Sequence, residues 1–524
     1  MSHAILKACR RPSPGVSLLV LALSAALAGC AITPAPVTQA EQAAQASADR
    51  QLLFSDQEAV TGPISLNEAI ARAIKYNLDH RLAVMEQALQ NRQIDLSRYD
   101  ILPKLAANAG YSTRSNENAS SSRSYLTGRQ SLEPSVSQDR QRETADLTTT
   151  WNILDFGVGY YAAHQQADRS LIAAERRRKV LHSIIQQVRG AYWQAATAQR
   201  LQASINPVLA EARQALADSR QAEREQLLPP LDALRYRKAL MEAVRQLEAQ
   251  EADLVVAKAQ LAALMSLPPG QAFEVAIPDD ALRTLPEIPL ALDDMERLAL
   301  ANRPELREEI YQARVSAGET RKAMLRMLPG VSVLAGLNYD SNSYLVHEQW
   351  AEAGTRVTWN LLSLFSGPAA IRAAEAQEEV ARTRRMALSM AVLAQVHVAT
   401  GNYQRARTQY QKAAELEEVE TRINEIVKSQ AASDAQSTIE RIRAATSAIA
   451  AELERDRSLA EAQNAASSIY VTLGLDPLPE AVEGHDIASL AAALKRIGDD
   501  WRQGRMPMPA AETVSAPGGK EGDV

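Results

Sequence analysis

Four short segments of the chain alternate between apolar and polar side chains. In the first, apolar or aromatic residues stand at the odd positions from Leu105 to Tyr111, and most even positions hold small or polar residues. The alternating segments are residues 104–112, 145–154, 331–340 and 354–362. Because successive side chains of a strand point to opposite faces, each segment predicts a strand with one apolar and one polar face. Such strands fit a membrane β-barrel with lipid outside and water inside, or a soluble antiparallel sheet lying on a layer of helices.

Most of the remaining chain has helical patterns. From Leu66 to Leu89, apolar residues recur at spacings of three and four, which predicts an amphipathic stripe. Two long helical segments are each followed by a shorter antiparallel partner: residues 159–228 with 232–266, and residues 368–429 with 434–474. At 1.5 Å per residue, the long helices would reach roughly 105 Å and 90 Å, which is more than a globular domain uses.

Glycine and proline bound these long segments. Gly157 and Gly159 are interpreted as breakers before the first long helix, and Gly367-Pro368 as the breaker before the second. Pro207 lies inside the first long segment, where its missing N–H predicts a kink.

The chain also contains two copies of one unit. Leu102-Pro103 recurs as Leu328-Pro329 after 226 positions, and Trp151-Asn152-Ile153-Leu154 recurs as Trp359-Asn360-Leu361-Leu362 after 208 positions. A polar loop at residues 113–144 accounts for the difference in displacement. The predicted domains are a first repeat at 61–267, a linker at 268–290, a second repeat at 291–476, and a C-terminal segment with a disordered tail at 477–524.

The N-terminal residues have the pattern of a secretory signal. A basic start is followed by an apolar stretch from Val16 to Ala28, which is too short to span a bilayer. The stretch ends in Leu27-Ala28-Gly29-Cys30, which resembles the lipobox of bacterial lipoproteins. That resemblance implies a signal peptide at 1–29, acylation (as by palmitate) at Cys30, and the outer membrane as destination because Ala31 follows. Residues 30–60 would form a lipidated tether, whereas an ordinary signal with a coincidental cysteine is the alternative.

Composition and charge exclude several classes of function. The 524 residues carry 57 Lys and Arg against 63 Asp and Glu, a net charge of −6 that argues against a nucleic-acid binder. The two cysteines form no CxxC pair and the histidines have no metal-ligand spacing, so neither a metal site nor a cofactor is expected. Asp155-Phe156-Gly157 lacks the other motifs of a kinase, and no other motif indicates an enzyme.

If the four strands lie in a membrane, the chain must form an oligomer. Four strands cannot close a barrel, and an open sheet edge in lipid leaves backbone groups without hydrogen bonds. Tyr111 and Tyr339 end two strands, while Trp151 and Trp359 lie near the opposite ends of the other two, which predicts aromatic belts at both interfaces. The loops at 113–144 and 341–353 are long and polar and lie on the same side of the predicted sheet, as the long loops of membrane β-barrels do.

The duplication, the two Leu-Pro pairs before strands and the segment Trp151-Asn152-Ile153-Leu154-Asp155-Phe156-Gly157 together resemble the TolC family of outer-membrane efflux and secretion ducts. The match covers residues 60–480, in a lipidated member. The resemblance implies a mainly α-helical trimer in which each chain gives four strands to one twelve-stranded β-barrel. It also implies a hollow α-helical tunnel of long coiled-coil helices, and an equatorial belt from the linker and the segment after Pro477.

The same resemblance implies a periplasmic gate at the turns between long and short helices. Asp232 and Asp434 occupy the matching positions, and threefold symmetry would make each a ring of three carboxylates. Both could instead be helix N-caps, and the two roles are compatible. Ser437 and Gln430 depart from the family pattern, so the resemblance implies gating here but does not imply the ionic latch of the prototype. The adaptor would contact the tips at Pro229, Pro230 and Ser433.

The expected function is therefore a passive, trimeric outer-membrane channel in a tripartite efflux or secretion system. The implied partners are a periplasmic adaptor (membrane fusion) protein, an inner-membrane pump of the RND or ABC type, and outer-membrane lipid. Drug or metal export by a proton-driven pump and type I secretion of protein by an ATP-driven pump would use the same duct. The alternative is a non-conducting periplasmic coiled-coil lipoprotein that scaffolds an envelope complex.

Overall fold

The structure is a computed structural model that describes residues 34–131, 133–225, 229–277, 285, 287–431, 438–478, 484 and 486–506. The chain divides into two units, residues 1–57 and 58–524. In the first unit, the described residues form helix α2 (Gln39–Leu52), whose N-terminus is capped by Thr38 and Glu41 and which has no buried residue. The sequence pattern of residues 30–60 predicts a tether and no helix, so α2 is a difference from the expectation.

The second unit contains the same order of elements twice. The first repeat consists of α3 (Leu66–Tyr76), α4 (Leu78–Tyr99), β1 (Lys104–Thr113), β4 (Gln141–Asn152), α5 (Ile153–Arg224) and α6 (Pro230–Leu264). The second consists of α8 (Leu292–Asn302), α9 (Pro304–Leu325), β5 (Gly330–Asp340), β6 (Gln349–Thr358), α10 (Ser363–Ala431) and α11 (Thr438–Thr472). Helices α8 and α9 lie 226 positions after α3 and α4, and α11 lies 208 positions after α6. The duplication inferred from the sequence is thus present in the fold.

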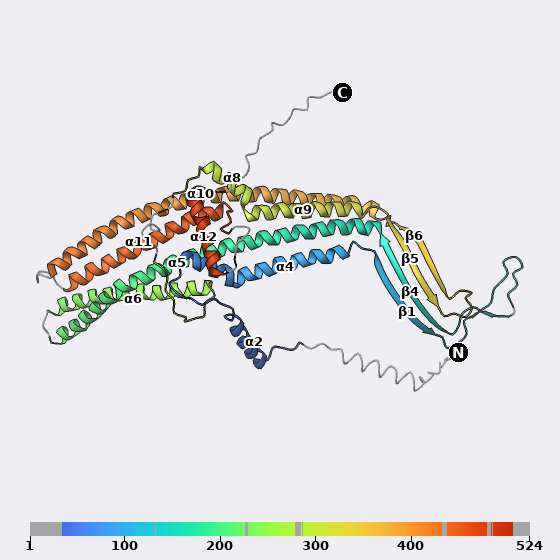
Figure 1. Ribbon diagram of the computed structural model, residues 1–524, viewed down its shortest axis with the longest axis horizontal. Helices are drawn as coiled ribbons and strands as arrows, with labels where there is room; N and C mark the ends of the chain where they lie inside the picture. The colour runs from blue at the N-terminus through green and yellow to red at the C-terminus, as the bar shows by residue number, and fades with distance from the viewer. Residues whose placement is uncertain are drawn as a thin grey trace, which may run out of the picture. The chain divides into compact units, whose positions relative to one another are not determined.

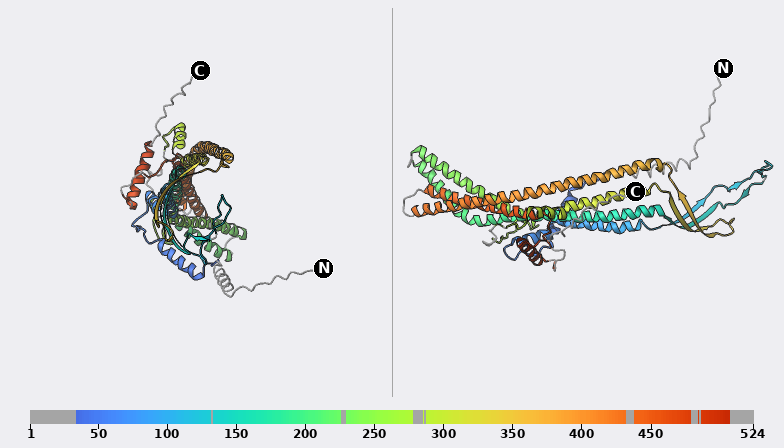
Figure 2. Two further views of the ribbon diagram at one scale, coloured as in Figure 1. Left: turned by 90° about the vertical axis from the view of Figure 1, so that its right-hand side faces the viewer. Right: turned by 90° about the horizontal axis from the view of Figure 1, so that it is seen from above.

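The four long strands form one antiparallel sheet in the order β1-β4-β5-β6. Leu147 pairs with Ala107 on one side and Leu337 on the other, and Leu337 pairs in turn with Ala351. This register keeps all odd-numbered residues on one face of the sheet. Figure 2 shows the four strands curving together at one end of the long helices, where β4 continues directly into α5.

Two strand boundaries differ from the prediction. Strand β4 begins at Gln141 rather than at 145, and β6 spans 349–358 rather than 354–362. Residues 141–144 are polar on both faces, so only their pairing with the end of β1 identifies them as strand. In β6, Trp350 stands at an even position among polar residues, which hides the alternation. The loop at 113–144 contains a small hairpin of β2 (Ala119–Ser120) and β3 (Ser135–Val136).

The glycines and prolines interpreted as breakers lie inside helices. Asn152 caps α5 by accepting hydrogen bonds from the N–H groups of Leu154 and Asp155, so the helix begins before Gly157 and Gly159. Helix α10 likewise begins at Ser363 and includes Pro368. Both interpretations were wrong. For α5 the reason is that Asn152, the last residue of β4, caps the helix ahead of the two glycines. Helix α5 also continues through Pro207.

The long helices pack in antiparallel pairs, α5 with α6 and α10 with α11 (Figure 1). Helix α5 also contacts α4, α9 and α11, and α10 also contacts α9 and α8. A core near the middle of the unit joins α3 and α5 to residues from the linker and from α12 (Ile487–Arg502). There Ile64 bridges to Val275, and the Tyr192 hydroxyl donates to the carbonyl of Ala276 at 2.6 Å.

Candidate functional site

The apolar face of the sheet is exposed along its length. Leu105, Tyr111, Leu337 and Val357 all stand on this face and expose 60–70 % of their surface. Every residue of β1 and β6 is exposed. No described helix covers this face, so the soluble sheet lying on a helix layer does not fit the structure. A broad apolar surface of this kind requires a covering that the described chain does not provide.

The opposite face carries a network of polar groups. The Asn108 amide donates to the Asp146 carboxylate at 2.8 Å, and the Thr148 hydroxyl donates to the same oxygen at 3.1 Å. Arg142 forms a two-pronged ion pair with Asp340, with distances of 3.0 Å and 2.6 Å. Charged groups that form hydrogen bonds of this kind are favoured in a polar environment and are costly to place in hydrocarbon. The sheet therefore has one apolar face and one polar face.

The four predicted aromatic residues lie near the strand ends. Tyr111, Tyr339 and Trp151 are on the apolar face, with Tyr111 and Tyr339 toward one end and Trp151 toward the other. Trp359 lies one residue beyond β6, and its indole N–H donates to the carbonyl of Met327 at 3.0 Å. Trp151 is 40 % exposed and its ring contacts Phe156 edge-on, with 5.8 Å between the ring centroids.

The structure describes only part of the predicted gate and anchor. Cys30, Ser433 and Asp434 lie outside the described residues. Pro229 is the N-cap of α6 and Pro230 its first residue, a position where proline is favoured because its missing N–H would have no helical partner. Asp232 is the third residue of α6, so the alternative role as N-cap of this helix does not apply to it.

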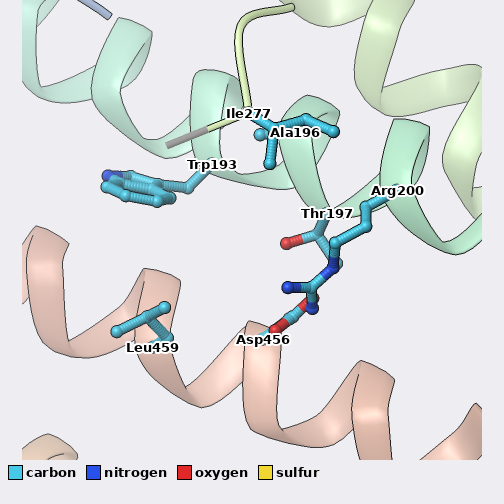
Figure 3. Close-up of a pocket in the computed structure, with 7 residues that line it drawn as sticks. All are labelled: Trp193, Ala196, Thr197, Arg200, Ile277, Asp456 and Leu459. Atoms are coloured by element: carbon cyan, nitrogen blue, oxygen red, sulfur yellow. The ribbon is translucent and has the colours of Figure 1, made fainter. Parts of the chain in front are cut away.

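An ion-pair network that no sequence pattern predicts joins the two repeats. Arg200 of α5 pairs with Asp456 of α11, and Figure 3 shows the two side chains pointing toward one another at a cavity of about 20 Å³. Arg455 binds Asp456 at 3.0 Å and Glu417 of α10 at 3.1 Å. The side chain of Asp456 is 6 % exposed. The only sequence signal was the acid-base spacing on α11, which is common on solvated helices.

A second polar cluster ties α5 to the residues that follow α11. His182 Nε2 lies 3.0 Å from Asp476 Oδ1, and Arg178 donates to both carboxylate oxygens at 3.0–3.1 Å. Arg178 also donates to the carbonyl of Gly474 at 3.2 Å. Burial alone would raise the pKa of Asp476, but the hydrogen bonds and charges of His182 and Arg178 outweigh it and lower that pKa below its ordinary 3.8.

Among the described residues, no three His, Cys, Asp or Glu side chains are placed to hold a metal ion. No helix in the described part of the chain is both long and apolar enough to cross a bilayer. The arrangement consists instead of a two-faced sheet and long polar helices.

No family model matches the sequence, and no curated protein matches it either. The structure is nevertheless similar to solved structures over most of its length. The Campylobacter jejuni outer-membrane channel CmeC matches with a TM-score of 0.62 and 14 % identity, covering 84 % of this chain and 93 % of that one. The chain has the fold of an outer-membrane channel.

Two further structures agree with this result. CusC, described in connection with transmembrane channel formation, matches with a TM-score of 0.61 and 16 % identity, covering 80 % of this chain and 96 % of that one. The Neisseria gonorrhoeae channel MtrE, solved in its open state, matches with a TM-score of 0.58 and 16 % identity, covering 79 % and 94 %. The TolC-type fold predicted from the sequence is confirmed.

Proposed function

We propose that the protein is the outer-membrane channel of a tripartite efflux or secretion system and acts as a passive trimeric duct. The observation that carries this proposal is the exposed apolar face of the sheet, on the opposite side from the network of Asp146 and Arg142. Lipid on one face and water on the other satisfy both sets of side chains. The fold shared with CmeC, CusC and MtrE supports the same role.

The two edges of the sheet and the exposed side of helix α4 support assembly with further copies. Strands β1 and β6 form the two edges of the sheet, and an unpaired edge in lipid is costly. Helix α4 adds an exposed apolar stripe of Leu82, Met85, Leu89 and Leu96, each more than half exposed. Their spacing of three, four and seven residues is that of a helix–helix seam. Three copies with four strands each would give a barrel of twelve.

The proposed duct performs no chemistry, and its energy comes from partners. An inner-membrane pump of the RND or ABC type would supply substrate through a periplasmic adaptor that binds the helical tips near Pro229, Pro230 and Ser433. Asp232 and Asp434 would form carboxylate rings at the periplasmic mouth, and acylation of Cys30 would anchor each chain in the outer membrane. Drugs, metal ions and proteins all remain candidate cargo.

The test uses the full chain expressed with its N-terminal segment and purified from the outer-membrane fraction. We expect a trimer by light scattering in detergent and stable ion conductance in planar bilayers. Leu337→Arg serves as the control, because a charge on the apolar face should prevent insertion and abolish conductance. A monomer that conducts no ions would contradict the duct and favour the non-conducting scaffold.

A further inference from the structure

The two strand hairpins of the sheet have the same internal register. In the first, Asn108 pairs with Asp146. In the second repeat, the equivalent of Asn108 is Leu334, 226 positions later, and the equivalent of Asp146 is Gly354, 208 positions later. Leu334 and Gly354 also pair with each other, in the second hairpin. The register of one hairpin therefore maps onto the other without a shift. Because the strand register is the same in both repeats, the contact between the two hairpins of one chain provides a template for a contact between hairpins of neighbouring copies.

That contact is the pairing of β4 with β5, in which Thr144 stands opposite Asp340. Its duplicate joins β6 to a β1 strand, with Glu352 in the place of Thr144 and Arg114 in the place of Asp340. Within one chain, β1 and β6 are the outer strands of the sheet and are separated by β4 and β5. The β1 strand must therefore come from another copy.

Resting on the proposed trimeric duct, we propose that β6 pairs antiparallel with β1 of the next copy in the register that places Glu352 opposite Arg114 of the partner subunit. In this arrangement, β1 and β6 of every copy each pair with one neighbouring copy, so the ring closes and no strand edge remains unpaired. It extends the sheet of one chain into a continuous wall in which the odd-numbered residues of all copies share the apolar face.

The charges at the two edges complement one another in this register. Glu352 and Arg114 both belong to the even-numbered, polar face and are exposed. Among the described residues, neither side chain forms an ion pair within the chain. The N–H of Arg114 donates to the carbonyl of Arg140 at 2.9 Å, so the backbone pairing that aligns β1 continues to this residue.

The equivalent position inside the chain shows how such a seam is held. There Asp340 is bound by Arg142, which stands diagonally across the strand pair. In the proposed contact between copies, the acidic residue is on β6 (Glu352) and the basic residue follows β1 of the partner subunit. Trp350 of β6 takes the place that Arg142 has in β4. The guanidinium of Arg114 of the partner subunit would thus lie opposite a carboxylate and diagonal to an exposed indole, which combines an ion pair with a cation–π contact.

Cysteine pairs at four positions test the register. The proposed register places Gly354 opposite Ser112 of the partner subunit, and Thr358 opposite Asn108 of the partner subunit. The double variants Gly354→Cys/Ser112→Cys and Thr358→Cys/Asn108→Cys should form disulfides between copies under mild oxidation. Exchanging the partners gives two controls, Gly354→Cys/Asn108→Cys and Thr358→Cys/Ser112→Cys. These are displaced by four residues, or about 13 Å, and should not cross-link.

The position of Gly354 suits this test because no atom lies within 4 Å of the Cβ that a cysteine would add. Cross-links are read on non-reducing gels, and the mass of the same samples is measured by light scattering. Trimers in which the exchanged pairs cross-link as efficiently as the in-register pairs, or in which no pair cross-links, overturn the register but not the duct. Monomeric samples overturn both.

Charge reversal provides a second test that needs no cysteine. Glu352→Arg or Arg114→Glu alone should reduce the trimeric fraction about threefold at fixed detergent and temperature, because like charges then stand opposite one another. The double variant Glu352→Arg/Arg114→Glu should restore it. Glu133→Arg, in the loop, is the matched control and should leave assembly unchanged. Failure of the double variant to recover the trimer would contradict the pairing.

Discussion

At the scale of single residues, the contact between α9 and α5 depends on the absence of a side chain. Gly318 lies against Gln165, which is 2 % exposed and whose amide donates to the carbonyl of Val315 at 2.7 Å. The Nζ of Lys322 donates to the amide oxygen (Oε1) of Gln165 at 2.7 Å. A Cβ at position 318 would lie 2.8 Å from the Gln165 amide nitrogen. A side chain at position 318 therefore has no room while Gln165 keeps its buried hydrogen bonds.

We expect Gly318→Ala to lower the free energy of unfolding by about 1–3 kcal/mol, because Gln165 must give up buried hydrogen bonds to make room. Gly401→Ala in α10 is the matched control, since no atom lies within 4 Å of its added Cβ. The control should be neutral or slightly stabilising, because alanine favours the helix. Thermal unfolding followed by circular dichroism measures both, and equal midpoints for the two variants would refute the packing argument.

The Asp476 cluster predicts how stability depends on pH. The pKa of Asp476 is lowered in the folded state, so its contribution to stability is present above its ordinary 3.8 and is lost as the pH falls through the lower, folded-state value. Asp476→Asn should therefore destabilise the protein at neutral pH, by less than about 1 kcal/mol because the side chain is 41 % exposed to solvent, and should weaken the loss of stability below pH 4. Unfolding midpoints from pH 2 to 7 test this, and an unchanged acid limb would show that Asp476 has no such role.

At the scale of elements, helix α4 shows the difference between a pattern and its burial. The apolar stripe that begins at Leu66 is buried in α3, where Ile70 is 1 % exposed. Along α4 the same stripe continues but is exposed, with Leu89 at 56 %. The sequence predicted an amphipathic helix correctly, but periodicity says only that a face is apolar and not which molecule covers it.

We expect Leu89→Asp to reduce trimer formation by at least about tenfold while leaving the helical content of the chain unchanged. A charge in this stripe would be buried without a partner when copies assemble. Leu89→Met at the same position keeps an apolar side chain of similar volume and should assemble normally. Light scattering separates the two results, and normal assembly of Leu89→Asp would mean that α4 faces water in the complete molecule.

Much of the fold follows from local signals, and the exceptions have physical reasons. Alternation identified all four strands, and the duplication located the helices. The ends of β4 and β6 were misplaced because pairing with neighbours, rather than side-chain pattern, decides where a strand stops. The network of Arg200, Asp456 and Arg455 could not be predicted, because it depends on how helices far apart in sequence are placed against one another.

At the scale of the whole molecule, symmetry would convert single side chains into rings. Three copies would bring three Asp434 carboxylates together at the periplasmic mouth, where they attract cations. We expect Asp434→Ala to alter the conductance or the block by divalent cations in planar bilayers. Ser433→Ala, one residue away, is the control. Identical conductance and block in wild type and Asp434→Ala would remove this residue from the gate.

If the protein is an outer-membrane duct, the odd-numbered face of the sheet contacts lipid and the even-numbered face contacts water. Spin labels placed one at a time at residues 333 to 338 of the protein in liposomes report which solvent each face of the sheet contacts. We expect accessibility to oxygen, which concentrates in lipid, to peak at 333, 335 and 337, and accessibility to a water-soluble nickel complex to peak at 334, 336 and 338. Two profiles that rise and fall together, or high nickel accessibility at 337, would contradict it.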